Sequence, residues 1–296
     1  MEVTMVLVIN PYAGGGKALE KWQRIESELC SRLGAMTPLV LDPNISVKEY
    51  VGRMLREGKT EFIAAGGDGT VNLLLESLME QAPSELLPRV KVGAIGLGSS
   101  NDFHKPFQGN SFIGGVPAKV DFGSTIYRDV GLLTYEDEAR DLCKRYWLVN
   151  ASIGITAEAN LFFNSPDSVL RFLKRSSTES AILYAALHTI ATYHNRSMTI
   201  MIGDYQPFQT RVTNLGIVKS PHFSGNFCYD SDYEPNSGYF YVHLSENMSL
   251  RRTLTTLWRL SRKKFSGFPL THSWRANRIA VRSAQPFAVE FDGEVI

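Results

Sequence analysis

The segment 61–70, with the sequence EFIAAGGDGT, places the tightest constraint on how this chain can fold. An apolar run, then Gly-Gly-Asp-Gly-Thr, then helix-forming residues predict a strand, a tight turn and a helix start. The glycines let the backbone turn sharply and approach a ligand closely. Helix-start N–H groups suit phosphate, whereas Asp68 would repel phosphate unless a cation such as Mg²⁺ lay between them. For an isolated motif, a glycine-rich turn with a capping Asp is the better interpretation.

The first hundred residues repeat this alternation of apolar runs and helical periodicity. Apolar runs predict strands over 3–9, 38–41, 61–65 and 91–95. Periodicity near 3.6 predicts helices over 19–33, over 47–58, and from the glycine turn to Leu78. Because crossovers between parallel strands are right-handed, such a chain forms a doubly wound parallel sheet. We therefore predict an N-terminal α/β domain over residues 1–125.

Three polar, glycine-rich segments each follow a predicted strand, at residues 10–17, 66–70 and 96–103. In open α/β folds the ligand lies outside the carboxyl ends of the strands, so these loops are expected to converge on one site. None of them matches the dinucleotide fingerprint GxGxxG or the P-loop GxxxxGK[ST]. The convergence predicts a ligand site that belongs to neither standard class.

Beyond residue 125 the pattern changes to period-2 alternation, which is typical of strands with one buried face. Two helical interruptions are expected, over 178–194 and 249–264. We predict a mostly antiparallel β domain over residues 126–296, so that the fold class is α/β plus all-β. The predicted strands cover residues 146–150, 198–202, 210–218, 239–244, 278–282 and 287–291.

The cysteines and the length of the apolar runs indicate where in the cell this protein is expected. The three cysteines are far apart and form no CxxC pair, which favours a reducing, intracellular location over a disulfide framework or a zinc site. No apolar run approaches the roughly 18 residues that span a bilayer, so any contact with a membrane is expected from outside it.

The net charge of +1 hides an uneven distribution. No acidic residue lies between Glu246 and Glu290, while nine Lys and Arg fall between Arg251 and Arg282. Residues 249–264 predict an amphipathic helix with Leu250, Leu254, Leu257 and Trp258 on one face, and its basic residues are Arg251, Arg252, Arg259, Arg262, Lys263 and Lys264.

Two interpretations of this helix carry equal weight. It suits an anionic membrane surface, or it covers a sheet with its leucines in the core and its charges in water. No recognised motif supports nucleic-acid binding.

With these residues in view, the chain resembles the diacylglycerol kinase catalytic-domain family, in particular the soluble bacterial lipid kinases related to sphingosine kinases. Gly66–Thr70 matches the family's GGDGT signature, and Gly98–Phe103 resembles its GTGNDF loop with Ser99 and Ser100 at the Thr and Gly positions. Further similar segments are Asn10-Pro11 with Gly14 and Gly16, Asp121–Gly123, Asn150–Glu158, and Asp292–Glu294, which matches the late DGE motif.

The resemblance implies transfer of the ATP γ-phosphate to a lipid hydroxyl, with Mg²⁺, in a cleft between the α/β domain and a β-sandwich domain. It implies that Asp68, Asp102 and Asp121 form a water-linked Mg²⁺ network, and that Asp292 is the general base with Glu294 beside it. The implied nucleotide-binding residues are Asn10, Gly14, Gly16, Lys17, Gly66, Gly67, Asp68, Gly69, Thr70, Gly98, Ser99 and Asn101.

Chemistry supports these roles, because phosphoryl transfer depends mainly on positioning and charge neutralisation. From the residues alone, however, a hairpin-turn dipeptide is the better interpretation of Asp292-Gly293, and the resemblance is what favours the catalytic one. Two other functions stay open: a soluble-metabolite kinase of the NAD kinase type, and a non-catalytic nucleotide- or lipid-binding protein. The acceptor lipid and the oligomeric state, including a homodimer, are also open.

The resemblance further implies a cytoplasmic protein that acts peripherally at the inner membrane face. The family often has a structural Mg²⁺ site before a strand turn, and Glu234–Tyr239 is the matching stretch, with Ser237 in the Asp place. Relatives are expected to continue beyond the DGE motif and return a strand to the first domain. A cleft for acyl chains is expected to involve Phe162, Phe163, Leu170 and Phe172.

Overall fold

The computed structural model describes residues 5–34, 36–109 and 111–296. Val3 and Thr4, at the start of the first expected strand, lie outside the described residues. The chain divides into two compact units, Met1–Trp147 and Leu148–Ile296.

This division falls later than the expected boundary at residue 125 because of one hairpin. Strands β7 (Gly131–Glu136) and β8 (Leu142–Trp147) pair antiparallel, and β8 packs against helix α3 (Asp68–Gln81). Asn72 of α3 donates from Nδ2 to the Tyr146 carbonyl at 2.7 Å.

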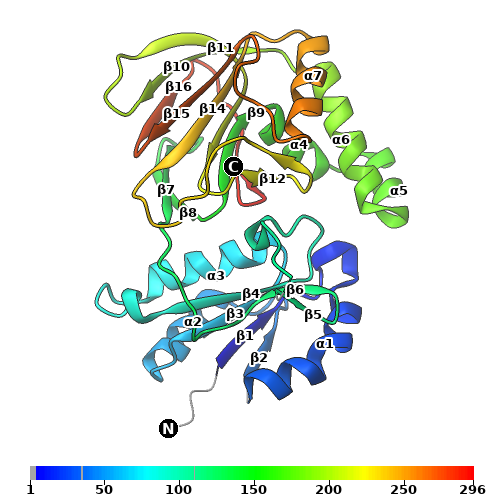
Figure 1. Cartoon of the computed structure of the whole chain (residues 1–296), viewed down its shortest axis with the longest axis vertical. Coiled ribbons are helices and arrows are strands. Elements are labelled where there is room, and N and C mark those ends of the chain that lie inside the picture. Colours follow the sequence, from blue (N-terminus) through cyan, green and yellow to red (C-terminus); the bar gives the residue numbers. More distant parts are fainter. Residues whose placement is uncertain (1–4, 35, 110) are drawn as a thin grey trace. The chain divides into compact units, whose positions relative to one another are not determined.

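The N-terminal unit contains a six-stranded sheet in the order β2-β1-β3-β4-β6-β5. Its first four members are parallel: β1 (Met5–Ile9), β2 (Met36–Val40), β3 (Glu61–Gly66) and β4 (Lys91–Gly96). Strands β6 (Val116–Lys119) and β5 (Phe112–Ile113) add antiparallel pairings at the β4 edge. Helices α1 (Ala18–Leu33), α2 (Val47–Arg56) and α3 are the crossovers, with a short 3-10 turn, η2 (Leu87–Arg89), before β4. The predicted N-terminal α/β fold is confirmed (Figure 1).

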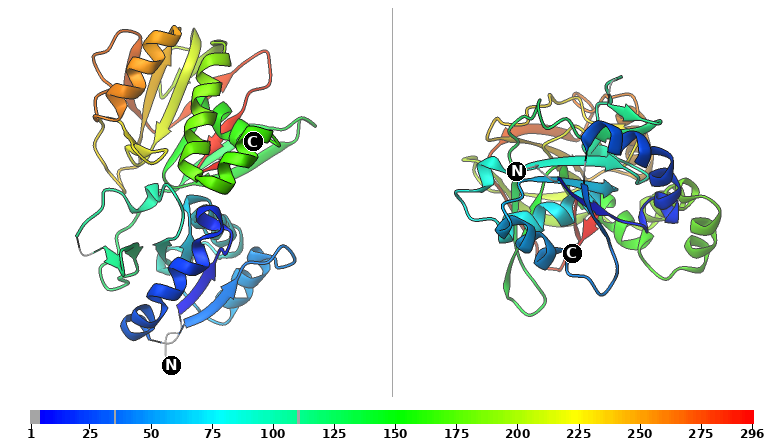
Figure 2. Two further views of the ribbon diagram at one scale, coloured as in Figure 1. Left: turned by 90° about the vertical axis from the view of Figure 1, so that its right-hand side faces the viewer. Right: turned by 90° about the horizontal axis from the view of Figure 1, so that it is seen from below.

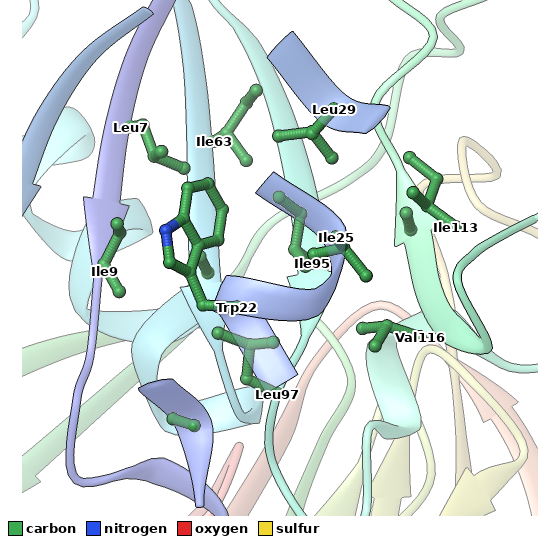
Figure 3. Packing of buried hydrophobic residues seen from close by; sticks show 13 residues of the cluster. Leu7, Ile9, Trp22, Ile25, Leu29, Ile63, Ile95, Leu97, Ile113 and Val116 are labelled. Atoms are coloured by element: carbon green, nitrogen blue, oxygen red, sulfur yellow. The ribbon is translucent and has the colours of Figure 1, made fainter. Parts of the chain in front are cut away.

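Both faces of this sheet are buried, as expected when parallel strands have helices on each side. Figure 3 shows the ring of Trp22, from α1, over one face beside Leu7 and Ile63. The alternate strand residues Val6 and Phe62 are fully buried as well. The near-continuous apolar character of β1 and β3 therefore has a direct structural cause.

In the C-terminal unit the predicted, mostly antiparallel sheet is confirmed. Eight strands form one sheet, and every pairing in it is antiparallel. They are β9 (Asn150–Gly154), β10 (Arg196–Ile202), β11 (Phe208–Val218), β14 (Phe240–Glu246), β15 (Thr271–Ala276), β16 (Ile279–Arg282), β17 (Val289–Phe291) and β18 (Glu294–Val295).

The long strand β11 joins the two branches of this sheet. Its first half pairs with β10 and its second half with β9, and a register shift between Val212 and Asn214 separates the two. The expected sandwich is thus realised as a single branched sheet, beside a small hairpin of β12 (His222–Phe223) and β13 (Phe227–Cys228).

Four helices belong to the C-terminal unit: α4 (Ile155–Phe163), α5 (Ser168–Ser176), α6 (Thr178–Thr192) and α7 (Leu250–Leu260). The periodicity predicted α6 and α7, which lie side by side in Figures 1 and 2. It did not predict α4 and α5, which are short. Along the described chain, no helix combines the length and the apolar character that crossing a bilayer requires.

Candidate active site

The three glycine-rich loops of the N-terminal unit meet backbone to backbone. Gly14 lies in the 3-10 turn η1 (Ala13–Gly16) at φ +60°, and a Cβ there would lie 2.5 Å from the Leu97 carbonyl oxygen. A Cβ on Gly98 would lie 2.5 Å from the Gly67 Cα. Because real Cβ contacts are never this short, both positions need glycine for the loops to approach. The convergence predicted from the strand order is present.

Asn10 joins the first loop to the helix that follows the second. Its backbone N–H donates to the Ala65 carbonyl at 2.9 Å, and its Nδ2 donates to Thr70 Oγ1 at 3.0 Å. The Thr70 hydroxyl fills the space beside Gly66, where a Cβ would lie 2.2 Å from it. The structure therefore brings together Asn10, Gly66 and Thr70, three of the predicted nucleotide-binding residues.

Asp68 joins the second loop to the third. Its Oδ2 accepts the Asp102 N–H at 3.0 Å and its Oδ1 accepts the Phe103 N–H at 2.8 Å. These amides open the 3-10 turn η3 (Asp102–His104). The carboxylate thus fixes the position of the third loop through both of its oxygens.

Asp102 is buried and takes part in an ion pair. Lys105 Nζ lies 2.6 Å from Asp102 Oδ1, and the two side chains are 9% and 6% exposed. Ser100 Oγ donates to Asp102 Oδ2 at 2.7 Å. Ser100, where the family pattern has Gly, therefore supplies a hydrogen bond to the loop's carboxylate.

The three carboxylates predicted to hold Mg²⁺ do not form a ready coordination shell. Asp68 accepts two amides, Asp102 pairs with Lys105, and Asp121 is exposed in a local turn where it accepts the Gly123 N–H at 2.9 Å. Among the described residues, no group of three or more His, Cys, Asp and Glu could hold a metal ion. This donor set fits a divalent cation only through water or phosphate oxygens.

Asn101 adopts a left-handed conformation, with φ 51° and ψ 44°, at the start of η3. Its Nδ2 lies 3.2 Å from both the Gly96 and the Gly98 carbonyl oxygens. Its Oδ1 is buried and has no hydrogen-bond partner among the described residues. The side chain therefore orders the third loop and retains one free acceptor.

Two cationic groups near the loops were not found from the sequence. Lys21 Nζ donates to the carbonyls of Leu97, at 3.2 Å, and Gly98, at 3.3 Å. Burial, and then Lys17 and Arg24, lower the pKa of Lys21. Its position four residues after Lys17 on α1 was the available signal, since residues at this spacing share a helix face.

Lys119 is the second of these groups. It donates from Nζ to the Phe103 carbonyl at 3.0 Å, and burial, then Arg128, lower its pKa to about 8. It therefore supports the segment that Asp68 also holds.

In the C-terminal unit, Asp292 and Gly293 form a two-residue hairpin turn between β17 and β18, because Phe291 pairs with Glu294. Both turn residues have positive φ, 47° and 93°, as in a type I′ turn. The Asp292 carboxylate is 3% exposed. It accepts the N–H of Leu148 at 2.6 Å, of Val149 at 2.8 Å and of Asn150 at 3.1 Å. Asp292-Gly293 is therefore a hairpin-turn dipeptide, as one of the two interpretations predicted. Its carboxylate also binds the backbone of residues 148–150.

Glu290 is a second buried carboxylate beside this turn. It accepts the Ser152 hydroxyl at 2.7 Å and the Gly293 N–H at 2.9 Å. Sequence reasoning missed Glu290 because it occupies an alternate position in an apolar strand. Glu294, by contrast, is exposed.

A cavity of about 990 Å³ lies in the C-terminal unit, beside α4 and the end of α6. Phe162 and His188 stack in its wall, with ring centroids 4.0 Å apart, and Arg196 pairs with Glu158 at 2.9 Å. Of the residues expected to surround acyl chains, only Phe162 lines it: Leu170 is in a core cluster and Phe172 is exposed. The predicted acyl-binding set is therefore not gathered in this cavity.

The turn over residues 234–239, where a structural Mg²⁺ site was considered, contacts an ammonium group. Buried Lys219 donates from Nζ to the Tyr239 carbonyl at 2.6 Å and lies 3.5 Å from the Glu234 carbonyl. Ser237 Oγ lies 3.3 Å from the same Glu234 carbonyl. A cationic side chain thus binds the carbonyls of this turn.

The fold of this chain is similar to those of solved protein structures. Across 99% of the chain the fold matches a "putative diacylglycerol kinase" from Bacillus anthracis Sterne, with a TM-score of 0.71 and 17% identity over 88% of that chain. A diacylglycerol kinase structure from the same organism matches with a TM-score of 0.67 and 13% identity, covering 99% of this chain and 90% of that one. At these identities the likeness shows the fold.

A family model and a curated relative match part of the sequence. Residues 4–125 match the family model described as diacylglycerol kinase catalytic domain, which confirms the resemblance seen in the motifs. A "Putative lipid kinase" of Streptococcus pneumoniae serotype 4 is 27% identical over 126 residues, which span 43% of this chain and 41% of that protein. The similarity in sequence to a diacylglycerol kinase catalytic domain thus extends over residues 4–125, which are less than half of the chain.

Proposed function

We propose that this protein is an ATP-dependent lipid kinase that transfers the γ-phosphate to the hydroxyl group of a lipid. The observation that carries the proposal is the convergence of three glycine loops, tied together by Asn10 and Asp68, in a segment that matches a kinase family. Close backbone approach exposes N–H groups to a polyphosphate, and phosphoryl transfer depends mainly on such positioning.

In this proposal the nucleotide lies against the N-terminal unit. Gly14, Gly16, Gly67, Gly69, Gly98 and Ser99 would face its phosphates with their backbone, while Asn10, Thr70, Asn101 and Lys17 would contribute side chains. Asp68 would act by holding the third loop, in agreement with its two amide contacts. Mg²⁺ would arrive bound to ATP as part of the substrate, and Asp68, Asp102 and Asp121 would reach it through water.

Asp292 would accept the hydrogen bond of the attacking lipid hydroxyl, with Glu294 beside it. Three N–H donors stabilise the charged carboxylate and make it a weak base. A loose transition state needs little proton removal before the phosphoryl group moves. Orientation of the hydroxyl, followed by late proton acceptance, is therefore the role that suits Asp292.

The helix α7 supports action at an anionic membrane surface. Its buried residues are Thr253, Thr256 and Leu260. Leu250, Leu254 and Trp258, spaced four residues apart, are 55%, 42% and 57% exposed. An outward apolar stripe among arginines suits a bilayer interface better than a sheet-covering helix.

The first experiment follows labelled γ-phosphate from ATP into a mixed lipid extract, with NAD and fructose 6-phosphate as competing acceptors. The matched pair of variants is Gly98→Ala and Gly109→Ala. A Cβ on Gly98 meets the Gly67 backbone, whereas a Cβ on Gly109 meets nothing within 4 Å. We expect label in an organic-soluble product, lost in Gly98→Ala and kept in Gly109→Ala.

Label only in a water-soluble product would identify a metabolite kinase instead. ATP binding without transfer to any acceptor would favour a non-catalytic binding protein. Asp292→Asn is a poor first variant, because its NH2 group would replace one acceptor oxygen and face the N–H of Leu148, or those of Val149 and Asn150, and disturb folding.

The membrane role has a separate test. Vesicles of phosphatidylcholine with and without phosphatidylglycerol are sedimented with wild type, with Leu254→Ala/Trp258→Ala, and with Arg278→Ala. Arg278 pairs with Asp204 outside α7 and serves as the control. We expect binding to anionic vesicles that the α7 variant loses; equal binding by all three proteins would remove α7 from the proposal.

A further inference from the structure

Lys21 links helix α1, which follows the first glycine loop, to the third glycine loop. Among the described residues, it is the one lysine that makes this link. Its ammonium lies on α1, which follows η1, and it donates to the carbonyls of Leu97 and Gly98. A Cβ on Gly14 would lie 3.7 Å from the same nitrogen. Lys21 Nζ is therefore located where the first and third loops touch.

An ammonium group has three N–H donors, and the two carbonyls take two of them. No carboxylate lies within ion-pairing distance of Lys21 among the described contacts, although acidic partners are recorded for other cations of this unit, such as Lys48, Lys91 and Lys105. A lysine held by neutral carbonyls keeps its full charge available to a ligand. The remaining donor and this charge favour an anion at the loop junction.

The charge around Lys21 points the same way. Lys17, at the start of α1, and Arg24 are close enough to lower the pKa of Lys21. Arg24 lies 4.0 Å from Glu20, so Lys17 and Lys21 are the two cations whose mutual repulsion a bound anion would relieve. Because Lys21 is partly buried, its contact with a phosphate would be stronger than that of a fully exposed lysine.

We propose that Lys21 is a phosphate-positioning residue, which uses its third N–H to bind the polyphosphate of the nucleotide while its other two hold the third loop against the first. This inference rests on the proposed function, because it assigns a residue to the nucleotide site. It adds a residue that the family motifs quoted above do not include. In this inference, cationic side chains neutralise the charge of the phosphates. This agrees with the contacts of the two aspartates, because Asp68 accepts two backbone amides and Asp102 pairs with Lys105.

The test measures binding of adenosine, AMP, ADP and ATP to the full-length protein by titration calorimetry. Lys21→Met is compared with wild type, with Lys21→Arg, and with Lys48→Met, the same change at an exposed lysine of this unit. A charge-assisted hydrogen bond supports a loss of about ten- to a hundredfold in ATP affinity for Lys21→Met. Adenosine affinity should change little, Lys21→Arg should keep most of the ATP affinity, and Lys48→Met should match wild type.

The outcomes separate this inference from the proposed function. If wild type binds none of the nucleotides, both fail. If wild type binds ATP and Lys21→Met binds it equally well, the assignment of Lys21 is wrong and the proposed function stands. Equal weakening of adenosine and ATP would show a loop brace without phosphate contact and would also overturn the assignment. Thermal unfolding of each variant, measured in parallel, identifies a loss that comes from misfolding.

Discussion

Asp68 and Asp292 are each followed by glycine, and their carboxylates bind backbone amides in two different ways. Asp68 opens a helix and accepts two N–H groups from a loop 34 and 35 residues later. Asp292 lies in a hairpin turn, is 3% exposed, and accepts three N–H groups from residues 142 to 144 positions earlier. Asp68 is only half-buried, so water can replace part of what it does. The comparison teaches that one dipeptide can hold a glycine-rich loop in one unit and a distant backbone segment in the other.

The largest effect is expected from Asp292→Ala. It leaves three buried N–H groups without their acceptor, and each such group costs about 1–3 kcal/mol, so the free energy of unfolding should fall by at least about 3 kcal/mol. Urea unfolding followed by circular dichroism measures the loss. Glu294→Ala, at an exposed position two residues away, is the control and should change stability by less than about 0.5 kcal/mol. Similar stability of the two variants would refute a structural role for Asp292.

The sequence predicts the local backbone structure around Asp68 and Asp292 but not the distant groups that their carboxylates bind. The hairpin turn follows from Asp-Gly between apolar residues, and the strand-loop-helix at Asp68 follows from the glycines and the apolar run. The amides that each carboxylate binds could not be predicted, because they lie far along the chain and backbone N–H groups carry no residue signature. The same limit explains why Lys21, whose partners are two carbonyls, escaped notice.

Periodicity was also insufficient for α7. The spacing of Leu250, Leu254, Leu257 and Trp258 predicted an amphipathic helix but not which of these residues would be buried. The structure buries Thr253, Thr256 and Leu260, and the Thr256 hydroxyl is satisfied by the Arg252 carbonyl at 2.9 Å. A threonine whose hydroxyl bonds to its own helix can be buried, so the inner face combines Thr253 and Thr256 with Leu260 and the half-buried Leu257.

Acid should destabilise both units through one buried histidine in each. Burial first, then Lys119, lowers the pKa of His104 to about 3, and burial lowers the pKa of His243 to about 4 although Asp230 opposes the shift. Since an unfolded histidine has a pKa of 6.5, the unfolded state binds the proton first as the pH falls below that value. The stability is present above pH 6.5 and is lost toward the folded pKa values. At pH 5 each histidine accounts for about 2 kcal/mol of loss relative to pH 7.

Urea unfolding of wild type, His104→Gln and His243→Gln at pH 7 and pH 5 checks this. Each substitution should reduce the difference between the two pH values by about 2 kcal/mol. A pH difference that neither variant reduces would assign the acid sensitivity to other groups. The two histidines differ in their hydrogen bonds. His243 is hydrogen-bonded to Ser273 at 2.9 Å, whereas His104 Nδ1 has no partner among the described residues. His243→Gln should therefore cost more at pH 7 than His104→Gln.

A smaller stability effect is expected from Asp68→Ala, at about 1–2 kcal/mol, because water can reach part of the site and solvate the released amides. Its effect on the ligand should be larger than its effect on the fold, since the third loop loses its attachment to α3. Calorimetric titration with ATP, beside urea unfolding, separates the two effects. If Asp68→Ala lowered stability as much as Asp292→Ala while leaving ATP affinity unchanged, the two aspartates would have the same role and the comparison would fail.

The smallest effect is expected from Ser100→Ala, which removes the hydrogen bond to Asp102 Oδ2. Lys105 still neutralises the carboxylate at 2.6 Å, so we expect a loss of about 1 kcal/mol in the free energy of unfolding and little change in ATP affinity. Lys105→Met is the contrasting variant, because it leaves a buried carboxylate without its cation and should cost about 3 kcal/mol or more. An Asp102 site that tolerated Lys105→Met but not Ser100→Ala would mean that the hydroxyl, and not the ammonium, balances this loop. The residue that departs from the family pattern would then be the one on which the third loop depends.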